Sequence, residues 1–321
     1  MKAYSLLLLL IISPHPLAAA ADGLDQAIQL YQHGRFYQAA DLLSRMVPSS
    51  GTDAELRLWF GKALLKTHKW DEAVHQMEKA VELKPNEAVY YLWLGRAFGG
   101  RASHSTFFTA PGWAKKVFKS FETAERLAPE NLDVRFDLMS YYLNAPAFLG
   151  GGRDKALAEA EAIGKVSPSA GCTARSLIFE KEKVWDQARA ELLKATTMSP
   201  RDVNALLDLA DFLLRRREYP EAEAKARKAL RFNASLPRAK LILAAAQIRL
   251  GEDLAEAEST LETLSQGPLT DDDPDFEDVF YWLGQAYLAE GKKQEAQGAF
   301  SAALRYNPDY DKAKSALSKL R

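Results

Sequence analysis

Residues 280–308 read FYWLGQAYLAEGKKQEAQGAFSAALRYNP, and this stretch decides the fold. Apolar residues recur at helical spacing on both sides of Gly291, which predicts two helices joined by a tight turn. In the second helix two alanines stand seven positions apart, at Ala296 and Ala303, and Pro308 follows five positions later. Because proline cannot continue a helix, Pro308 closes the unit.

The same triplet of two small residues and a proline returns along the chain. Two further copies match it fully and two carry one larger residue: Ala73–Ala80–Pro85, Ala188–Ala195–Pro200, Val117–Ala124–Pro129 and Ala156–Ile163–Pro168. Self-similarity at a period near ~34 residues indicates a solenoid of helical hairpins. About eight units fit into residues 21–310, and residues 311–321 are expected to form a helix that caps the last unit.

A column of small residues explains how the two helices of each unit would pack. Its members stand at equivalent positions of the first helices: Gly61, Gly95, Ala210, Ala244 and Gly284. A large side chain at these positions would hold the second helix of the same hairpin away. The column therefore predicts a close crossing of the two helices in each unit.

These residues resemble the tetratricopeptide repeat family. The family pattern is matched most closely by Tyr91, Leu94-Gly95 and Phe98, and by Leu283-Gly284, Tyr287, Ala296, Phe300, Ala303 and Pro308. The resemblance covers nearly all of residues 21–321. It implies an all-α, right-handed superhelical solenoid whose open concave side, lined by the first helices, holds a peptide or a partner helix.

The first twenty residues differ from the rest of the chain. Lys2 precedes an apolar run from Tyr4 to Ile12, and several alanines follow. This order is typical of a cleavable secretory leader, so residues 1–20 are predicted to be removed and the protein to be periplasmic or secreted. The apolar run is shorter than the roughly 20 residues that a membrane-spanning helix needs.

Composition excludes several classes of function. The 42 basic and 43 acidic residues give a net charge of −1, without the basic excess that nucleic-acid binding needs. The single cysteine, Cys172, cannot form an internal disulfide. The sequence shows no metal-ligand spacing, phosphate-binding loop or nucleophile elbow, so we expect no cofactor, no metal and no enzymatic activity.

Two of the predicted turns are expanded, at residues 99–113 and 144–153. Equivalent turns of successive repeats lie side by side, so the two expansions should place their apolar residues in one cluster: Phe107, Phe108, Trp113, Phe148 and Leu149. Such a cluster is either a local core or a recognition patch. The Ala-Pro-x-x-x-Gly-Gly-Gly pattern at 145–152 is also similar to exported bacterial tetratricopeptide proteins with the same paired expansions.

A third irregular segment is the linker at residues 265–275. Asp271, Asp273 and Asp275 alternate as at the start of a calcium loop, but Phe276 stands where such a loop needs glycine. A polar linker that caps the following helix is the favoured interpretation.

The helical spacing places two apolar columns on the concave side of the first helices. Either they pack against neighbouring first helices or they form a groove for a partner segment. The predicted groove residues are Leu58, Leu65, Leu92, Phe136, Leu143, Leu207, Leu214, Leu241, Ile248, Tyr281 and Leu288.

The sequence therefore predicts a non-enzymatic scaffold, exported to the cell envelope, that binds a partner peptide or helix in its concave groove. One alternative is a structural subunit of an envelope assembly or secretion complex. Another is an enzymatic activity at the expanded turns, which would use Arg101, Ser103, His104 or Ser105. Neither the partner nor the oligomeric state follows from the sequence.

Overall fold

The computed structural model describes residues 16–50 and 52–320, and within them the chain is entirely helices and turns. This confirms the predicted all-α fold. Most of the predicted leader, residues 1–15, lies outside the described residues. The helices are α1 (Pro16–Gln32), α2 (Phe36–Ser50), α3 (Ala54–Lys66), α4 (Trp70–Leu83), α5 (Ala88–Ser103), α6 (Ala110–Leu127), α7 (Leu132–Asn144), η1 (Ala147–Leu149), α8 (Arg153–Val166), α9 (Pro168–Lys181), α10 (Trp185–Met198), α11 (Val203–Arg215), α12 (Tyr219–Phe232), α13 (Pro237–Leu250), α14 (Leu254–Ser265), α15 (Phe276–Ala289), α16 (Lys293–Tyr306) and α17 (Asp311–Leu320).

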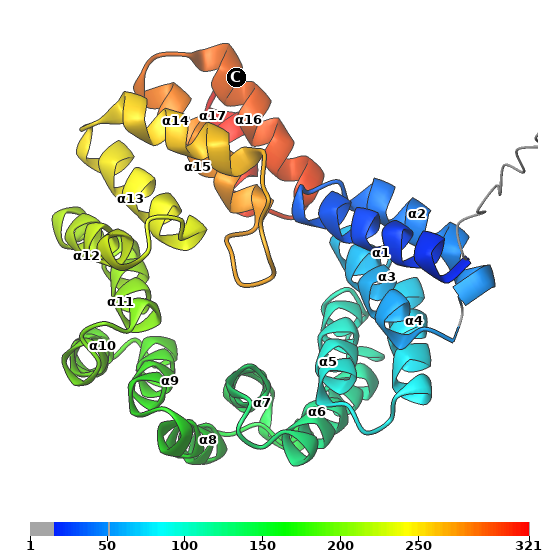
Figure 1. Ribbon diagram of the computed structural model, residues 1–321. Helices are drawn as coiled ribbons and strands as arrows, with labels where there is room; N and C mark the ends of the chain where they lie inside the picture. The colour runs from blue at the N-terminus through cyan, green and yellow to red at the C-terminus, as the bar shows by residue number, and fades with distance from the viewer. Residues whose placement is uncertain (1–15, 51, 321) are drawn as a thin grey trace, which may run out of the picture.

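Consecutive helices pack as hairpins, from α1 with α2 to α15 with α16, and α17 packs on α16. The odd-numbered helices of neighbouring hairpins also contact one another, as α3 does with α5 and α11 with α13. Figure 1 shows the hairpins arranged as a ring with the odd-numbered helices on its inner side. The inner surface is therefore built mainly from the first helix of each repeat.

The small-residue column sits where the two helices of a hairpin cross. A Cβ atom on Gly61 would lie 2.5 Å from Met77 Cε, and one on Gly284 would lie 2.5 Å from Phe300 Cε1. On Gly95 it would overlap the ring of Phe121. These approaches leave no room for a side chain, so the column fixes the distance between the helices.

The two expanded turns differ in how they use their extra residues. Much of the 99–113 expansion is helical, because α5 continues to Ser103 and α6 begins at Ala110. The 144–153 expansion forms the short η1 helix, which contacts α6 and whose Leu149 carbonyl accepts a 2.6 Å hydrogen bond from the Tyr141 hydroxyl. The expanded turn at residues 99–113 is thus reduced to residues 104–109, because α5 and α6 pack along their added length.

The first and last repeats meet, and this contact closes the ring. The centre of the Phe36 aromatic ring lies 6.1 Å from that of Phe276 and 5.9 Å from that of Tyr306. Gly34 has a φ of +70° in the turn between α1 and α2, and a Cβ there would lie 2.8 Å from the Tyr306 hydroxyl. The two ends of the array therefore meet in the described residues, because residues far apart in the chain share one apolar cluster.

The linker between α14 and α15 extends into the opening of the ring (Figure 1). Leu269 is buried in the cluster that joins the first and last repeats. Asp275 stands at the N-cap position of α15, but its side chain makes no capping hydrogen bond and instead pairs with Lys66 of α3. The expected role of the linker as a helix cap is thus replaced by contacts across the ring.

Two glycines of α5 give a matched test of the helix crossing. We expect Gly95→Ala to destabilise the fold by about 1–3 kcal/mol, because the methyl group overlaps Phe121 in a packed core. Gly99→Ala should raise stability by up to about 1 kcal/mol, because a Cβ there meets no atom within 4 Å and alanine favours the helix. The measurement is the thermal midpoint by circular dichroism, and equal midpoints for the two variants would contradict the close crossing.

Candidate functional site: the inner surface of the ring

The helix α7 stands between two cavities on the inner side of the ring. One, of about 680 Å³, lies between α7, α9 and α11, and the other, of about 450 Å³, lies between α5, α6 and α7. Asp137, Ser140 and Asn144 of α7 line both. We call the larger cavity the α7 groove; its main lining residues are Phe136, Leu143, Leu177, Lys181, Trp185 and Arg216.

The α7 groove combines an apolar floor with a charged rim. Leu177 is 37% exposed and lines the floor together with Phe136 and Leu143. On the rim, Arg215 donates to Glu180 at 2.8 Å and Lys181 donates to Asn144 at 2.7 Å. The guanidinium of Arg216 lies 4.5 Å from the ring centre of Trp185. The groove therefore presents apolar surface flanked by charges of both signs.

A series of alternating cations and aromatic rings runs along the inner surface toward the N-terminus. Lys62 Nζ lies 4.2 Å from the ring centres of Trp59 and Trp93, and Arg96 Cζ lies 4.7 Å from that of Trp93. Arg96 Nε then donates to Asp137 Oδ2 at 2.7 Å. Burial raises the pKa of the Asp137 carboxyl, although Arg96 acts to lower it.

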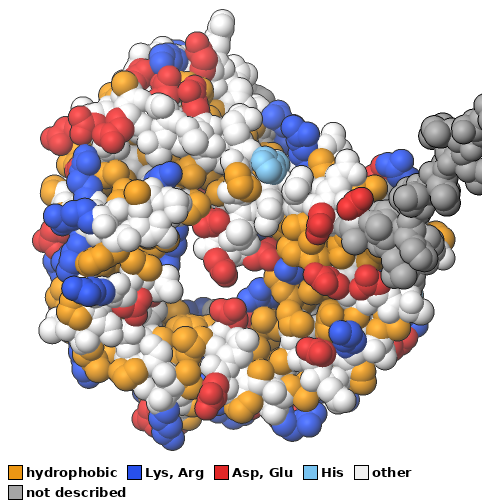
Figure 2. All heavy atoms as spheres, viewed as in Figure 1, with side chains coloured by type: hydrophobic (Ala, Val, Ile, Leu, Met, Phe, Trp, Pro, Cys, Tyr) orange, Lys and Arg blue, Asp and Glu red, His pale blue; other side chains and the backbone are white. Residues whose placement is uncertain are grey.

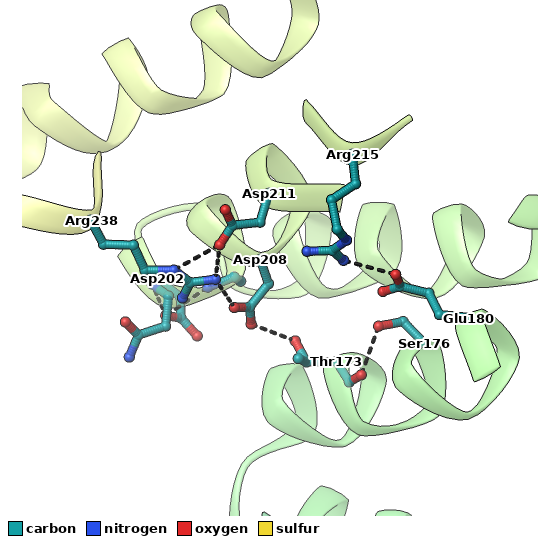
Figure 3. Close-up of polar contacts among 10 residues, drawn as sticks. Thr173, Ser176, Glu180, Asp202, Asp208, Asp211, Arg215 and Arg238 are labelled. Atoms are coloured by element: carbon teal, nitrogen blue, oxygen red, sulfur yellow. Dashed lines mark hydrogen bonds and ion pairs between the residues drawn. The ribbon is translucent and has the colours of Figure 1, made fainter. Parts of the chain in front are cut away.

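A second polar network ties α9, α11 and α13 together (Figure 3). Arg238 of α13 donates to Asp208 at 2.9 Å and also pairs with Asp211, while the Thr173 hydroxyl of α9 donates to Asp208 at 3.0 Å. Burial raises the pKa of Asp208, and Arg238 opposes that rise. The network spans three consecutive repeats and so fixes their relative positions beside the α7 groove.

The predicted groove residues separate into two groups. Five are buried, because neighbouring first helices pack directly on one another: Leu58, Leu92, Leu207, Leu241 and Ile248. The other six are partly buried: Leu65, Phe136, Leu143, Leu214, Tyr281 and Leu288. Of all eleven, Phe136 and Leu143 line the α7 groove. Leu177, Lys181 and Trp185 also line the groove and were missed by the sequence analysis.

The expanded turns place their aromatic residues in different surroundings. Trp113 packs 5.8 Å from the ring of Phe98, and Leu149 is partly buried. Phe107 and Phe108 contact each other at 5.8 Å but are 86% and 91% exposed, and Phe148 is 77% exposed. Most of these side chains therefore face solvent.

The Ser and His residues at the first expanded turn bond to backbone carbonyls of α5. Ser103 and Ser105 donate to Gly99 and Arg101, at 3.1 and 2.6 Å. His104 Nδ1 lies 2.9 Å from the Gly100 carbonyl oxygen, and its imidazole stacks on Trp70 at 4.5 Å. Both hydroxyls donate to backbone carbonyls and not to His104, so the geometry gives no support to a nucleophile and base pair.

Two kinds of feature are absent from the described residues. No group of three or more His, Cys, Asp or Glu side chains in residues 16–50 and 52–320 is placed to hold a metal ion. No helix in the described part of the chain has the length and apolar character to cross a membrane.

Two segments match known repeat families. Residues 60–100 match a tetratricopeptide repeat profile, and residues 174–306 match the middle TPR-like domain of cilia and flagella-associated protein 70. The fold is that of a tetratricopeptide repeat array. Such repeat proteins are generally scaffolds for protein–protein interaction and are typically non-enzymatic. Among curated proteins, none matches the chain in sequence.

Solved structures share this fold at low sequence identity. Yeast Tom70 is 15% identical with a TM-score of 0.61, and the match covers 98% of this chain and 66% of Tom70. A monomeric mutant of IFIT1, solved with Gppp-AAAA, is 17% identical with a TM-score of 0.51 and coverages of 92% and 70%. A thermophilic TPR protein from Thermus thermophilus, TTC0263, is 23% identical with a TM-score of 0.49, over 61% of this chain and 99% of that protein.

The Arg238 network gives a prediction with a defined pH dependence. We expect Arg238→Met to lower the free energy of unfolding by about 1–3 kcal/mol at pH 7, because two carboxylates lose their hydrogen-bonded cation. Without Arg238 the pKa of folded Asp208 rises further above its unfolded value of about 4. The folded variant then binds protons more tightly than the unfolded chain, so its stability should recover as the pH falls from 7 toward about 4.

The measurement is urea unfolding of the wild type and the variant at several pH values. Adding Asp208→Asn should restore part of the loss at pH 7. A stability difference that does not change with pH would contradict this electrostatic explanation.

Proposed function

We propose that the protein is a non-enzymatic scaffold that binds a segment of a partner protein in the α7 groove. The observation that carries this proposal is the exposed apolar floor of the groove, flanked by charges of both signs, on an inner surface of the ring that the linker leaves open. Figure 2 shows the opening at the centre of the ring, with charged side chains at its edge.

The groove fits a short amphipathic segment better than a globular surface. Phe136, Leu143 and Leu177 offer apolar contacts on neighbouring first helices, while Glu180 and Arg216 lie at the rim. A helix or an extended segment with apolar anchors and both charge signs complements this arrangement. Partner binding would use side chains already in place, since Arg215 and Lys181 are held by Glu180 and Asn144.

Export to the cell envelope is part of the same proposal and is supported by the leader pattern of residues 1–20. The side chains of α1 that pack in the core, Ala27 and Tyr31, follow the expected cleavage position and would remain. N-terminal sequencing of the protein from its own cells should find a mature chain that begins near residue 21, and an intact Met1 would contradict export by cleavage.

A photo-crosslinking amino acid placed at Leu177 tests the groove in living cells. Leu193 on α10 is the matched control, because it is also an exposed leucine, 41% against 37%, but lies outside the groove. We expect a discrete protein adduct from position 177 and none from position 193. Identical adducts from both positions, or none from position 177, would contradict partner binding in the α7 groove.

A further inference from the structure

The side chain of Lys62 is held between two tryptophans on the inner surface of the first repeats. Its Nζ lies 4.2 Å from the ring centres of Trp59 and Trp93, and the side chain is only 8% exposed. Trp59 belongs to α3 and Trp93 to α5, so two neighbouring first helices position the cation. A buried cation needs an anionic or hydrogen-bonding partner.

The linker supplies that partner from 209 residues away in the sequence. Asp271 Oδ2 accepts from Lys62 Nζ at 2.8 Å, and Asp271 Oδ1 accepts from the Tyr31 hydroxyl at 2.9 Å. Burial, and then the Asp271 carboxylate, raise the pKa of Tyr31 well above its ordinary value, so the hydroxyl stays a donor. Both oxygens of the carboxylate are thus bound by groups from two different repeats.

Three further contacts hold the linker in an orientation that a peptide ligand would share. The Leu269 side chain is 4% exposed within the apolar cluster of the first and last repeats. Its backbone N–H donates at 2.8 Å to the carbonyl of Gln32, at the end of α1, where helix carbonyls lack an intrahelical partner. Lys66 pairs with Asp275 at the other end of the segment.

We propose that the inner surface of the first three hairpins, together with the apolar cluster of the first and last repeats, is a binding site for an extended acidic peptide segment with a leucine two residues before an aspartate. Residues 267–275 occupy this site as an internal ligand. An apolar pocket, a carboxylate site and a backbone acceptor together are the elements by which grooves recognise peptides. A partner segment with the same order of residues would bind by displacing the linker. This proposal does not depend on the α7 groove.

Because the linker is part of the same chain, it competes with any free peptide for the site. A tethered ligand competes at an effective concentration that reaches millimolar, so a free peptide binds weakly while the linker remains in place. Weakening the linker should therefore expose the site. Asp271→Asn keeps the size of the side chain and leaves the Leu269 packing intact, so it weakens the linker with little risk to folding.

A fluorescein-labelled peptide of residues 267–276 tests the proposal by fluorescence anisotropy with the full chain. We expect the Asp271→Asn protein to bind it about ten-fold or more tightly than the wild type does, since the linker loses a charge-assisted hydrogen bond. The matched control is Asp272→Asn, because Asp272 is exposed and the change removes the same charge. This control should bind the peptide as weakly as the wild type.

The ligand chemistry is tested in the Asp271→Asn background. Lys62→Met, which keeps the apolar stem between the tryptophans, should weaken peptide binding about ten-fold or more. Asparagine at the peptide position of Asp271 should have the same effect, whereas asparagine at the position of Asp272 should not. Circular dichroism melting verifies that each variant folds. Equal peptide affinity for the wild type and Asp271→Asn, no binding to either, or no effect of Lys62→Met would overturn the proposal.

Discussion

The contact between the first and last repeats is the constraint on which the shape of the molecule depends. A helical solenoid has two free ends unless they bury surface against each other. Here Phe36 of α2 packs beside Phe276 and Tyr306 of the last hairpin, and Gly34 lets the α1–α2 turn approach closely. The imidazole of His68 adds a contact, with Nε2 3.1 Å from the Tyr306 carbonyl oxygen. These contacts convert a stack of hairpins into a ring with one inner surface.

Closure divides that inner surface into two parts with different roles. The linker covers the first repeats, where Asp271 bridges Lys62 and Tyr31. The α7 groove lies away from the linker and keeps its apolar floor open. The series of rings and cations from Trp59 to Asp137 joins the two parts along α3, α5 and α7. A partner in the α7 groove and an acidic segment at Lys62 would therefore use adjacent stretches of one surface.

Local sequence signals predicted the helices and how they cross. The column of Gly61, Gly95 and Gly284 could be found because its physical cause, the space needed by one side chain of the next helix, repeats at a fixed spacing. The groove was less predictable. Periodicity identified the inner face of each first helix, but it could not tell which residues of that face pack against a neighbouring helix. Leu207 and Leu241 were therefore predicted to line the groove, although they are buried. The floor residue Leu177 was not found, because it lies outside the two apolar columns that periodicity identified.

The ring itself had no signal in the sequence. Lys62 and Asp271 are 209 residues apart, and nothing near either residue indicates the other. The residues of the linker were noted for their alternating aspartates, yet their role depends on how the small rotation at each repeat accumulates over the whole array. Ring closure depends on the geometry of the whole array, so the local sequence pattern could not predict it.

A distance between spin labels across the contact of the first and last repeats tests ring closure most directly. In a Cys172→Ala background, labels at Tyr37 of α2 and Arg305 of α16 would lie on either side of it, and both positions are exposed. Pulsed electron–electron double resonance on the full chain should give one short, narrow distance distribution. A long or broad distribution, as an open superhelix would give, would contradict the closed ring.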